Sequence, residues 1–351
     1  MRLLLIVNPR ATNVTERHRA TVVRLLGERH QVEVATTLHR GHAIELARSA
    51  EGVDGIVVLA GDGTTNEAAA GIIARSAPTN DRDGGDRGTT PWLATLPGGG
   101  TNVLARTLGV PHRVGAATQA LLASLDAGSI RRVGVGSIGS GSIGSGSTDS
   151  GSTDSRVSLF HAGIGWDAEL VSVVEAHSRW KRRIGHGLFV YAGLRTFFGG
   201  YDRRHPHFSV HFDDGEQIDD GYFSIVMNSD PYTYVGRRPF TIAPSTTLDG
   251  PLTVVVLRSM SVPHFLPLLV DALRDRRGVR ERPWVRIRSG VEHVEYRALA
   301  APLDGAVGTD SATSGLRRPL LHQIDGDLMA PSDVLDVRHL PDVLDVVVPL
   351  P

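Results

Sequence analysis

The sequence predicts two domains: an α/β domain built on a parallel sheet, followed by a mostly antiparallel β-sandwich domain. From residue 1 to 128, short apolar runs alternate with amphipathic stretches, which is the pattern of a parallel sheet covered by helices on both faces. From residue 129 to 351, alternating apolar and polar runs are separated by Gly, Pro and Asp turns, which is typical of antiparallel strands. The 351 residues are enough for two domains with separate cores.

In the first domain, strands and helices are expected to alternate along the chain. The predicted strands are 3–7, 32–36, 55–60 and 92–96, and the predicted helices are about 15–29, 41–50, 64–76, 101–108 and 114–127. In the second domain, strands are expected at 157–162, 208–212, 222–228, 252–257, 285–287 and 291–296, with a broken, basic helical stretch at 168–198. Segments 80–90, 134–155 and 301–318 are poor in apolar residues and are predicted to be flexible insertions.

Composition excludes several classes of function. The 37 basic residues nearly match the 38 acidic ones, so no overall charge favours nucleic acid as a partner. The absence of cysteine excludes disulfides and thiolate chemistry and favours a cytoplasmic location. The only lysine is Lys181, so a Gly-Lys-Ser/Thr phosphate loop is absent. No apolar run reaches the roughly 18 residues of a membrane helix, so any membrane contact is expected to be peripheral.

A first glycine-rich turn follows the predicted strand 55–60. It reads Gly61-Asp62-Gly63-Thr64-Thr65-Asn66-Glu67 and opens a helix. Glycines allow backbone N–H groups to approach an anion closely, and the N-terminus of a helix favours negative charge. Taken alone, the turn is equally well explained as an ordinary Asp-Gly turn with a threonine cap.

A second glycine-rich turn, Pro97-Gly98-Gly99-Gly100-Thr101-Asn102, also follows an apolar strand and precedes a helix. Two such turns would lie at neighbouring carboxyl ends of one parallel sheet. Ligands bind at that edge of open α/β sheets. The pair therefore favours a phosphate-binding function over two unrelated turns.

Together with Asn8-Pro9 after the first strand, these motifs resemble the diacylglycerol kinase catalytic domain family, which includes sphingosine and ceramide kinases and bacterial soluble lipid kinases. The family patterns are Asn-Pro-x-Ser/Ala-Gly, Gly-Gly-Asp-Gly-Thr-x-Asn-Glu and Pro-x-Gly-Thr-x-Asn-x-x-Ala-Arg. The likeness continues at 162–168, 248–250, 324–327 and 340–349. It implies an NAD-kinase/diacylglycerol-kinase-like fold and an ATP- and Mg²⁺-dependent lipid kinase, with diacylglycerol as the expected acceptor.

The resemblance also implies roles for individual residues. Asp327 would be the base, with Asp325 beside it, and Asp249 with the carbonyl of Pro251 would help to hold a structural Mg²⁺. A lipid alcohol must lose its proton during phosphoryl transfer, which a carboxylate can accept. The residues expected to bind ATP are Asn8, Pro9, Arg10, Ala11, Thr12, Thr37, Ala60, Gly61, Asp62, Gly63, Thr64, Thr65, Asn66, Glu67, Gly100, Thr101 and Asn102.

The chain departs from the family pattern at three positions. Ala60 replaces a glycine, Thr246 stands where a further metal-ligating aspartate is expected, and Asp327 replaces a glutamate. Two alternatives therefore stay open: a small-molecule kinase of the NAD kinase type, and a nucleotide- or lipid-binding protein with impaired catalysis. The expected partners are a lipid alcohol and, transiently, a membrane surface; a homodimer is left open.

Overall fold

The computed structural model describes residues 1–76, 90–141, 155–166, 201–236, 238–274, 279–300 and 318–350. The chain divides into two compact units: unit 1 is Met1–Val135 with Pro341–Pro351, and unit 2 is Gly136–Leu340. The sequence predicts a domain boundary after residue 128 and assigns residues 129–351 to the second domain. Unit 1 instead extends to residue 135 and also contains residues 341–351. The helical stretch expected at 168–198 lies outside the described residues, as do 80–89, 142–154 and 301–317.

Unit 1 contains the predicted parallel sheet. Three of its strands, β1 (Arg2–Val7), β3 (Gly55–Ala60) and β4 (Trp92–Pro97), are buried along almost their whole length and appear in the sequence as continuous apolar runs. The fourth, β2 (Gln31–Thr36), lies at the edge of the sheet and is only partly buried. The order is β2-β1-β3-β4, and all neighbours are parallel. The C-terminal end of β18 (Val334–Val347) adds a parallel neighbour to β4, through the pair Val346 and Leu93.

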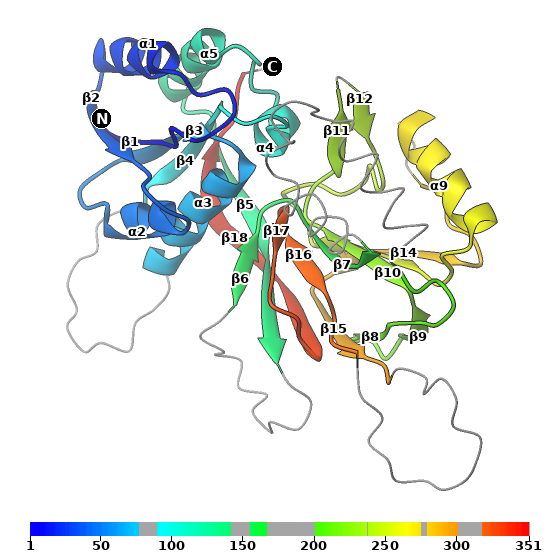
Figure 1. The fold of residues 1–351 in the computed structure, drawn as a ribbon. Helices are drawn as coiled ribbons and strands as arrows, with labels where there is room; N and C mark the ends of the chain where they lie inside the picture. Colours follow the sequence, from blue (N-terminus) through cyan, green and yellow to red (C-terminus); the bar gives the residue numbers. More distant parts are fainter. Residues whose placement is uncertain are drawn as a thin grey trace, which may run out of the picture. The chain divides into compact units, whose positions relative to one another are not determined.

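The helices of unit 1 pack in two pairs, one on each face of this sheet (Figure 1). One pair is α1 (Glu16–Gly27) and α5 (Val114–Asp126), which share a core with the strands. The other pair is α2 (His42–Ser49) and α3 (Asp62–Ser76), and the short helix α4 (Val103–Thr107) follows β4. These elements confirm the predicted α/β pattern, and their ends lie within two residues of the predicted ones.

The strand order positions the candidate site. From β1 the chain passes outward to β2 and then returns past β1 to β3, so the direction of the connections reverses between β1 and β3. In open α/β sheets, ligands bind outside the carboxyl ends of the strands at such a reversal. Here that edge carries Asn8 after β1, Gly61 after β3 and Gly98 after β4.

Unit 2 contains two sheets that share one hydrophobic core, in which Phe208 and Tyr296 are fully buried. Every described pairing within unit 2 is antiparallel, which confirms the predicted class. The first sheet has the order β14 (Val285–Val291), β13 (Leu252–Leu257), β10 (Phe223–Met227), β7 (His161–Gly165), β16 (His322–Ile324) and β17 (Asp327–Leu328). The second contains β18, β15 (His293–Ala298), β8 (Phe208–Phe212) and β9 (Gln217–Gly221), with β5 (Ile130–Gly141) and β6 (Arg156–Ser158) beside β18.

One predicted insertion begins later than the sequence indicates. Residues 134–141, expected to belong to a flexible segment, form the second half of β5. Val135 and Ile138 are buried there, and Gly136 to Ile138 pair with β6. This segment is rich in glycine and serine, so the sequence did not indicate a strand. Its few apolar residues point into the core. The described part of unit 2 also contains the hairpin of β11 (Thr233–Val235) and β12 (Arg238–Phe240), and α9 (Val262–Arg274).

A close approach of α3 to α2 yields a stability prediction. A Cβ added at Gly71 would lie 2.5 Å from the Ile44 carbonyl oxygen and 2.8 Å from Cβ of Ala47. Replacing a helical glycine by alanine normally stabilises a protein, but we expect Gly71→Ala to destabilise it by about 1–3 kcal/mol, because α2 must move away. The measurement is urea unfolding.

The matched control is Gly115→Ala in α5, where the new Cβ would meet only Thr21, at 3.9 Å. That variant should be unchanged or stabilised by up to about 1 kcal/mol. A Gly71→Ala protein as stable as the Gly115→Ala protein would contradict the packing described for α2 and α3.

Candidate functional site

The two glycine-rich turns of unit 1 contact each other through their backbones. Their strands end side by side, with Ala60 paired to Pro97, and the Gly98 N–H donates to the Ala60 carbonyl at 2.8 Å. A Cβ on Gly99 would lie 2.7 Å from Cα of Gly61, and one on Gly98 would lie 2.9 Å from Cα of Ala60. No side chain fits at these contacts, so the glycines allow the two turns to form one surface.

Two other glycines of the turns are not required by internal packing. A Cβ on Gly63 or on Gly100 would meet nothing within 4 Å among the described residues. Gly63 lies in the first turn of α3, a helix of 15 residues, and the N–H groups of such a turn point out of the helix. Open space at a helix N-terminus suits an anionic ligand.

Asn8 joins the end of β1 to the first glycine-rich turn. Its side-chain Nδ2 donates to Oγ1 of Thr64 at 2.9 Å, and its Oδ1 accepts the backbone N–H of Arg10 at 2.9 Å. Its own N–H donates to the Leu59 carbonyl at 3.3 Å. Asn8 therefore fixes both the loop that follows β1 and the hydroxyl of Thr64, which is buried.

Two asparagines hold the second turn. Asn102 adopts a left-handed backbone (φ 52°) and folds over Gly99, accepting its N–H at 2.7 Å and donating to its carbonyl at 2.8 Å. Asn13 donates from Nδ2 to the same carbonyl at 2.7 Å, and its N–H donates to the Gly98 carbonyl at 2.9 Å. Sequence reasoning did not identify Asn13; its position soon after the Asn8-Pro9 motif was the available signal.

Asp62 is used within the protein as a helix cap. Its Oδ1 accepts the N–H of Leu104 at 3.2 Å, at the start of α4. Burial raises the pKa of this carboxyl, while hydrogen bonds from the backbone of Val103, Leu104 and Asn102 act in the opposite direction. Asp62 thus connects the first turn to the helix that follows the second turn.

Glu67 and Thr65 also have internal partners. The Glu67 carboxylate accepts the N–H groups of Gly41 at 2.8 Å and Ala43 at 3.4 Å, so it caps the N-terminus of α2. Thr65 donates from Oγ1 to the Gly61 carbonyl at 3.2 Å. Both residues belong to the predicted nucleotide-binding set, but their side chains bond to backbone groups of the protein itself.

The remaining predicted nucleotide residues lie on the loops at the same edge of the sheet. Thr37 follows β2 directly, is buried, and donates its N–H to the Val7 carbonyl at 2.9 Å. Arg10 is exposed on the loop after β1. The structure therefore gathers the predicted set at one edge of unit 1; its other members there are Pro9, Ala11, Thr12, Asn66 and Thr101.

In unit 2, the Asp325 carboxylate is buried among four hydrogen-bond donors. It accepts the N–H groups of Leu159 at 2.7 Å and of Phe160 and His161 at 3.0 Å, and the hydroxyl of Ser158 at 3.0 Å. Burial raises its pKa to about 7, against the opposing effect of these hydrogen bonds. Its backbone has a φ of 50°, and it precedes Gly326, whose φ is 88°. Asp325 therefore anchors this turn to the segment 158–161.

Asp327 lies two residues further on, at the start of β17, where it pairs with Ile324 across the turn. Its side chain is half-buried, in contrast to that of Asp325. Of the predicted metal ligands, Asp249 is exposed on the loop before β13, and Pro251 directly precedes that strand. Asp325, Asp327, Asp249 and Pro251 all belong to unit 2.

A buried histidine that sequence reasoning did not identify lies beside this turn. The carbonyl of His161 accepts the N–H of Asp325 at 3.0 Å, and its ring lies against Tyr232 in a tilted arrangement, with 4.2 Å between centroids and 40° between planes. Burial lowers the pKa of His161 to about 3, so the ring is neutral. The available signal was its place before the Ala162-Gly163-Ile164-Gly165 motif.

The anchoring role of Asp325 yields a stability prediction. We expect Asp325→Ala to lower the free energy of unfolding by about 3 kcal/mol or more, because three buried N–H groups lose their acceptor. Ser158→Ala removes a single hydroxyl donor and should cost about 1 kcal/mol. Urea unfolding of both variants measures the difference, and equal stabilities would show that the four contacts do not hold the turn.

Comparison with known proteins agrees with this geometry. Residues 2–138 match the diacylglycerol kinase catalytic domain. No curated protein matches the chain. Three similar solved structures come from Bacillus anthracis str. Sterne: two are provisionally described as diacylglycerol kinases and one is described as a diacylglycerol kinase.

The structural likeness extends over almost the whole chain. The first solved structure has a TM-score of 0.68 at 18% identity, the second 0.62 at 18%, and the third 0.67 at 20%. Each comparison covers 99% of this chain and 96–97% of the other. At this identity the likeness establishes the fold, while the family match covers the glycine-rich edge. Residues 2–138 are therefore similar to the catalytic domain of a kinase family.

Proposed function

We propose that this protein is an ATP- and Mg²⁺-dependent lipid kinase that transfers the γ-phosphoryl group to a lipid hydroxyl, with diacylglycerol as the expected acceptor. The observation that carries the proposal is the pair of glycine-rich turns packed against each other after β3 and β4. Their surface offers a helix N-terminus and open space at Gly63 and Gly100, within the part of the chain that matches the kinase domain. These are the properties that bind phosphate groups.

The residues at this edge divide into two groups by what they contact. Asn8, Asp62, Glu67 and Asn102 hold the loops through the hydrogen bonds described above. The backbone N–H groups near Gly63 and Gly100, with the side chains of Arg10, Thr12 and Thr101 on the adjoining loops, are the groups that would contact ATP. Because the loops are already fixed, little ordering would be required when nucleotide binds, which favours positioning of the γ-phosphoryl group.

The loop before β13 has the chemistry to hold Mg²⁺. Mg²⁺ prefers oxygen ligands, and Asp249 would supply a carboxylate and Pro251 a carbonyl. Thr246 lies in the same loop with only 5% of its surface exposed, and its hydroxyl has no hydrogen-bond partner among the described residues. This hydroxyl would offer a neutral oxygen where the family has an aspartate. When bound, the ion would hold the loop before β13 in place.

Of the two aspartates in the turn after β16, Asp327 is the better candidate for the base. A base must reach the proton that it accepts, and the Asp325 carboxylate is enclosed by four donors. Asp327 is half-buried and lies on the strand that this anchor positions. We therefore assign proton acceptance from the lipid hydroxyl to Asp327 and positioning of the turn to Asp325.

The assignment of the base leads to a kinetic prediction. Asp327→Asn keeps the shape of the side chain but cannot accept the proton, so the rate of transfer should fall by about 10²–10⁴-fold while ATP affinity is retained. The assay incubates the protein with labelled ATP, Mg²⁺ and a total lipid extract and then identifies the labelled product. Asp333→Asn, at another half-buried aspartate nearby, is the control and should keep full activity.

The same assay tests the proposed function as a whole. Transfer to NAD instead of any lipid would favour the small-molecule kinase, and ATP binding without transfer would favour the impaired binding protein. Full activity in the Asp327→Asn variant would show that Asp327 is not the base.

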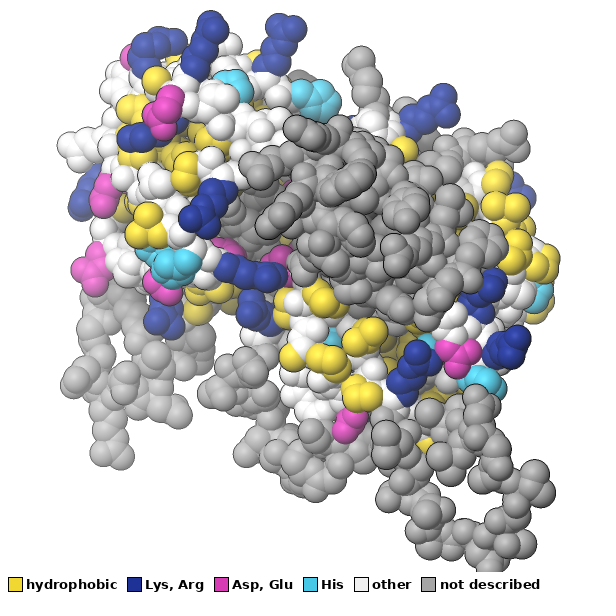
Figure 2. All heavy atoms as spheres, in the orientation of Figure 1, with side chains coloured by type: hydrophobic (Ala, Val, Ile, Leu, Met, Phe, Trp, Pro, Cys, Tyr) yellow, Lys and Arg dark blue, Asp and Glu magenta, His cyan; other side chains and the backbone are white. Residues whose placement is uncertain are grey.

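A lipid kinase must reach its substrate in a membrane, and α9 offers a surface for that contact. Among the described residues, no helix is both long and apolar enough to cross a bilayer. On α9, Val262, Leu266 and Val270 are 40%, 57% and 40% exposed and lie on one face, opposite the buried Phe265 and Leu268. Figure 2 shows hydrophobic side chains in the region where Figure 1 places α9.

We propose that this apolar face enters a membrane surface when the enzyme meets its lipid. Leu266→Glu should lower binding to phospholipid vesicles that contain diacylglycerol by about tenfold or more, since burying a leucine contributes roughly 1.5–3 kcal/mol. Cosedimentation with the vesicles is the measurement. Ile130→Glu, at a 43% exposed position in β5, is the control and should bind normally. Equal binding by both variants would exclude this face.

A further inference from the structure

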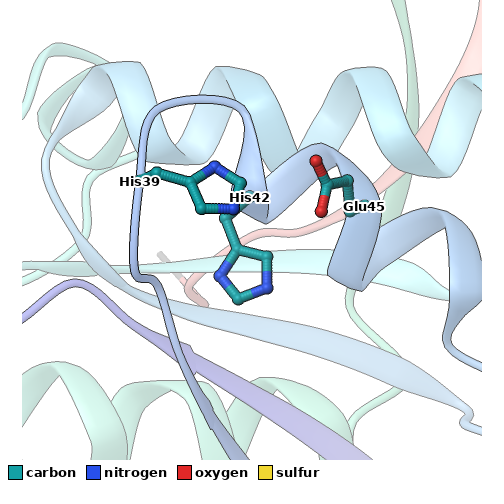
Figure 3. A group of neighbouring side chains, drawn as sticks. All are labelled: His39, His42 and Glu45. Atoms are coloured by element: carbon teal, nitrogen blue, oxygen red, sulfur yellow. The ribbon is translucent and has the colours of Figure 1, made fainter.

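Two histidines and a glutamate lie close together at the start of α2. His39 is on the loop after β2, and His42 and Glu45 are on the first turn of the helix, so the three residues follow one another at a spacing of three (Figure 3). One ligand atom from each side chain lies within 4.8 Å of the others. The two imidazole rings are stacked, with 4.7 Å between centroids and 26° between planes. The proposed kinase chemistry uses none of these three side chains.

The hydrogen bonds of the two imidazole rings determine which ring nitrogens are available to a metal ion. Nδ1 of His39 lies 3.0 Å from the Arg40 carbonyl, so it carries the proton and leaves the lone pair of Nε2 for a ligand. This is the usual arrangement of a metal-binding histidine, whose second nitrogen is fixed by a carbonyl. Nδ1 of His42 accepts the N–H of Leu38 at 3.1 Å. A metal ion at that nitrogen would displace an amide of an exposed residue, and water could take over the amide.

The local charge tolerates a cation at this position. The N-terminus of a helix carries partial positive charge, which alone would oppose a metal ion. Two carboxylates offset this effect: Glu45 on the first turn, and Glu67, which accepts the N–H groups of Gly41 and Ala43 at the same helix end. The cluster is therefore an imidazole-rich site with compensating negative charge.

We propose that His39, His42 and Glu45 bind a transition-metal ion, with Zn²⁺ as the best fit. Imidazole nitrogens with one carboxylate suit Zn²⁺ and similar ions, whereas Mg²⁺ prefers oxygen ligands, so this site would be separate from the Mg²⁺ of the kinase reaction. At Zn–ligand distances of 2.0–2.2 Å, tetrahedral ligands lie about 3.4 Å apart. The exposed side chains of His39 and Glu45 can close that distance by changing rotamers.

Metal at this site would fix the loop between β2 and α2. That loop begins at Thr37, which lies at the candidate nucleotide edge, and Glu67 connects its far end to α3. The ion would thus stabilise unit 1 near the glycine-rich turns. Its binding does not depend on the proposed kinase activity.

The test uses the untagged, full-length protein after treatment with a chelator. Isothermal titration with Zn²⁺ should show one equivalent bound, and Co²⁺ should give the visible absorption of a site with nitrogen ligands. His39→Ala and His42→Ala should each weaken Zn²⁺ binding by about tenfold or more. His112→Ala, at an exposed histidine on the loop before α5, is the control and should bind as the parent does.

The thermal transition supplies a second readout, because an ion that binds only the folded state raises the melting temperature. Zn²⁺ should raise it for the parent and for His112→Ala, but not for the double variant His39→Ala/His42→Ala. Absence of Zn²⁺ binding in the parent would overturn the proposal. Undiminished binding in the double variant would do the same, because the ion would then be held elsewhere.

Discussion

The backbone contact between the two glycine-rich turns is the constraint on which the candidate site depends. Because β3 and β4 are paired to their last residues, the chain leaving one strand meets the chain leaving the other. Gly61 and Gly99 approach so closely that a Cβ on Gly99 would lie 2.7 Å from Cα of Gly61. A Cβ on Gly61 would lie 3.3 Å from Cα of Gly99, so the contact excludes a side chain at position 99 and leaves little room for one at position 61. The close approach of the two turns therefore depends on these glycines.

Polar side chains then hold these turns in place. Asn8, Asn13 and Asn102 satisfy backbone or hydroxyl groups of the loops, and Asp62 and Glu67 each cap the N-terminus of a different helix. A buried polar group that loses its partner is costly, so each of these residues resists movement of the loop that it contacts. The motif residues with the most distinctive chemistry thus build the surface, and a ligand bound as proposed would contact mainly backbone N–H groups.

Sequence patterns predicted the parts of the structure that depend on local periodicity and turn chemistry. The continuous apolar runs of β1, β3 and β4 and the glycines that follow β3 and β4 indicated both the parallel sheet and the edge that carries the site. Contacts between distant segments left no such signal. Glu67 lies 26 residues from Gly41, and Asp325 lies 164 residues from His161, and nothing in the local sequence indicates these pairings. The second half of β5 was missed because its glycines and serines have a low propensity for strands.

In the proposed reaction, the two neighbouring aspartates in the turn after β16 have different roles. Asp325 has a left-handed backbone that turns its carboxylate toward four donors, and this buried network determines where the chain continues. Asp327 follows after one flexible glycine and begins the next strand, where its side chain keeps access to solvent. A carboxylate that must accept a proton has to remain accessible, while the one that positions it must be fully satisfied. An aspartate is shorter than a glutamate, so the place of the carboxylate at position 327 depends more strongly on the backbone. Asp325 holds that backbone in place.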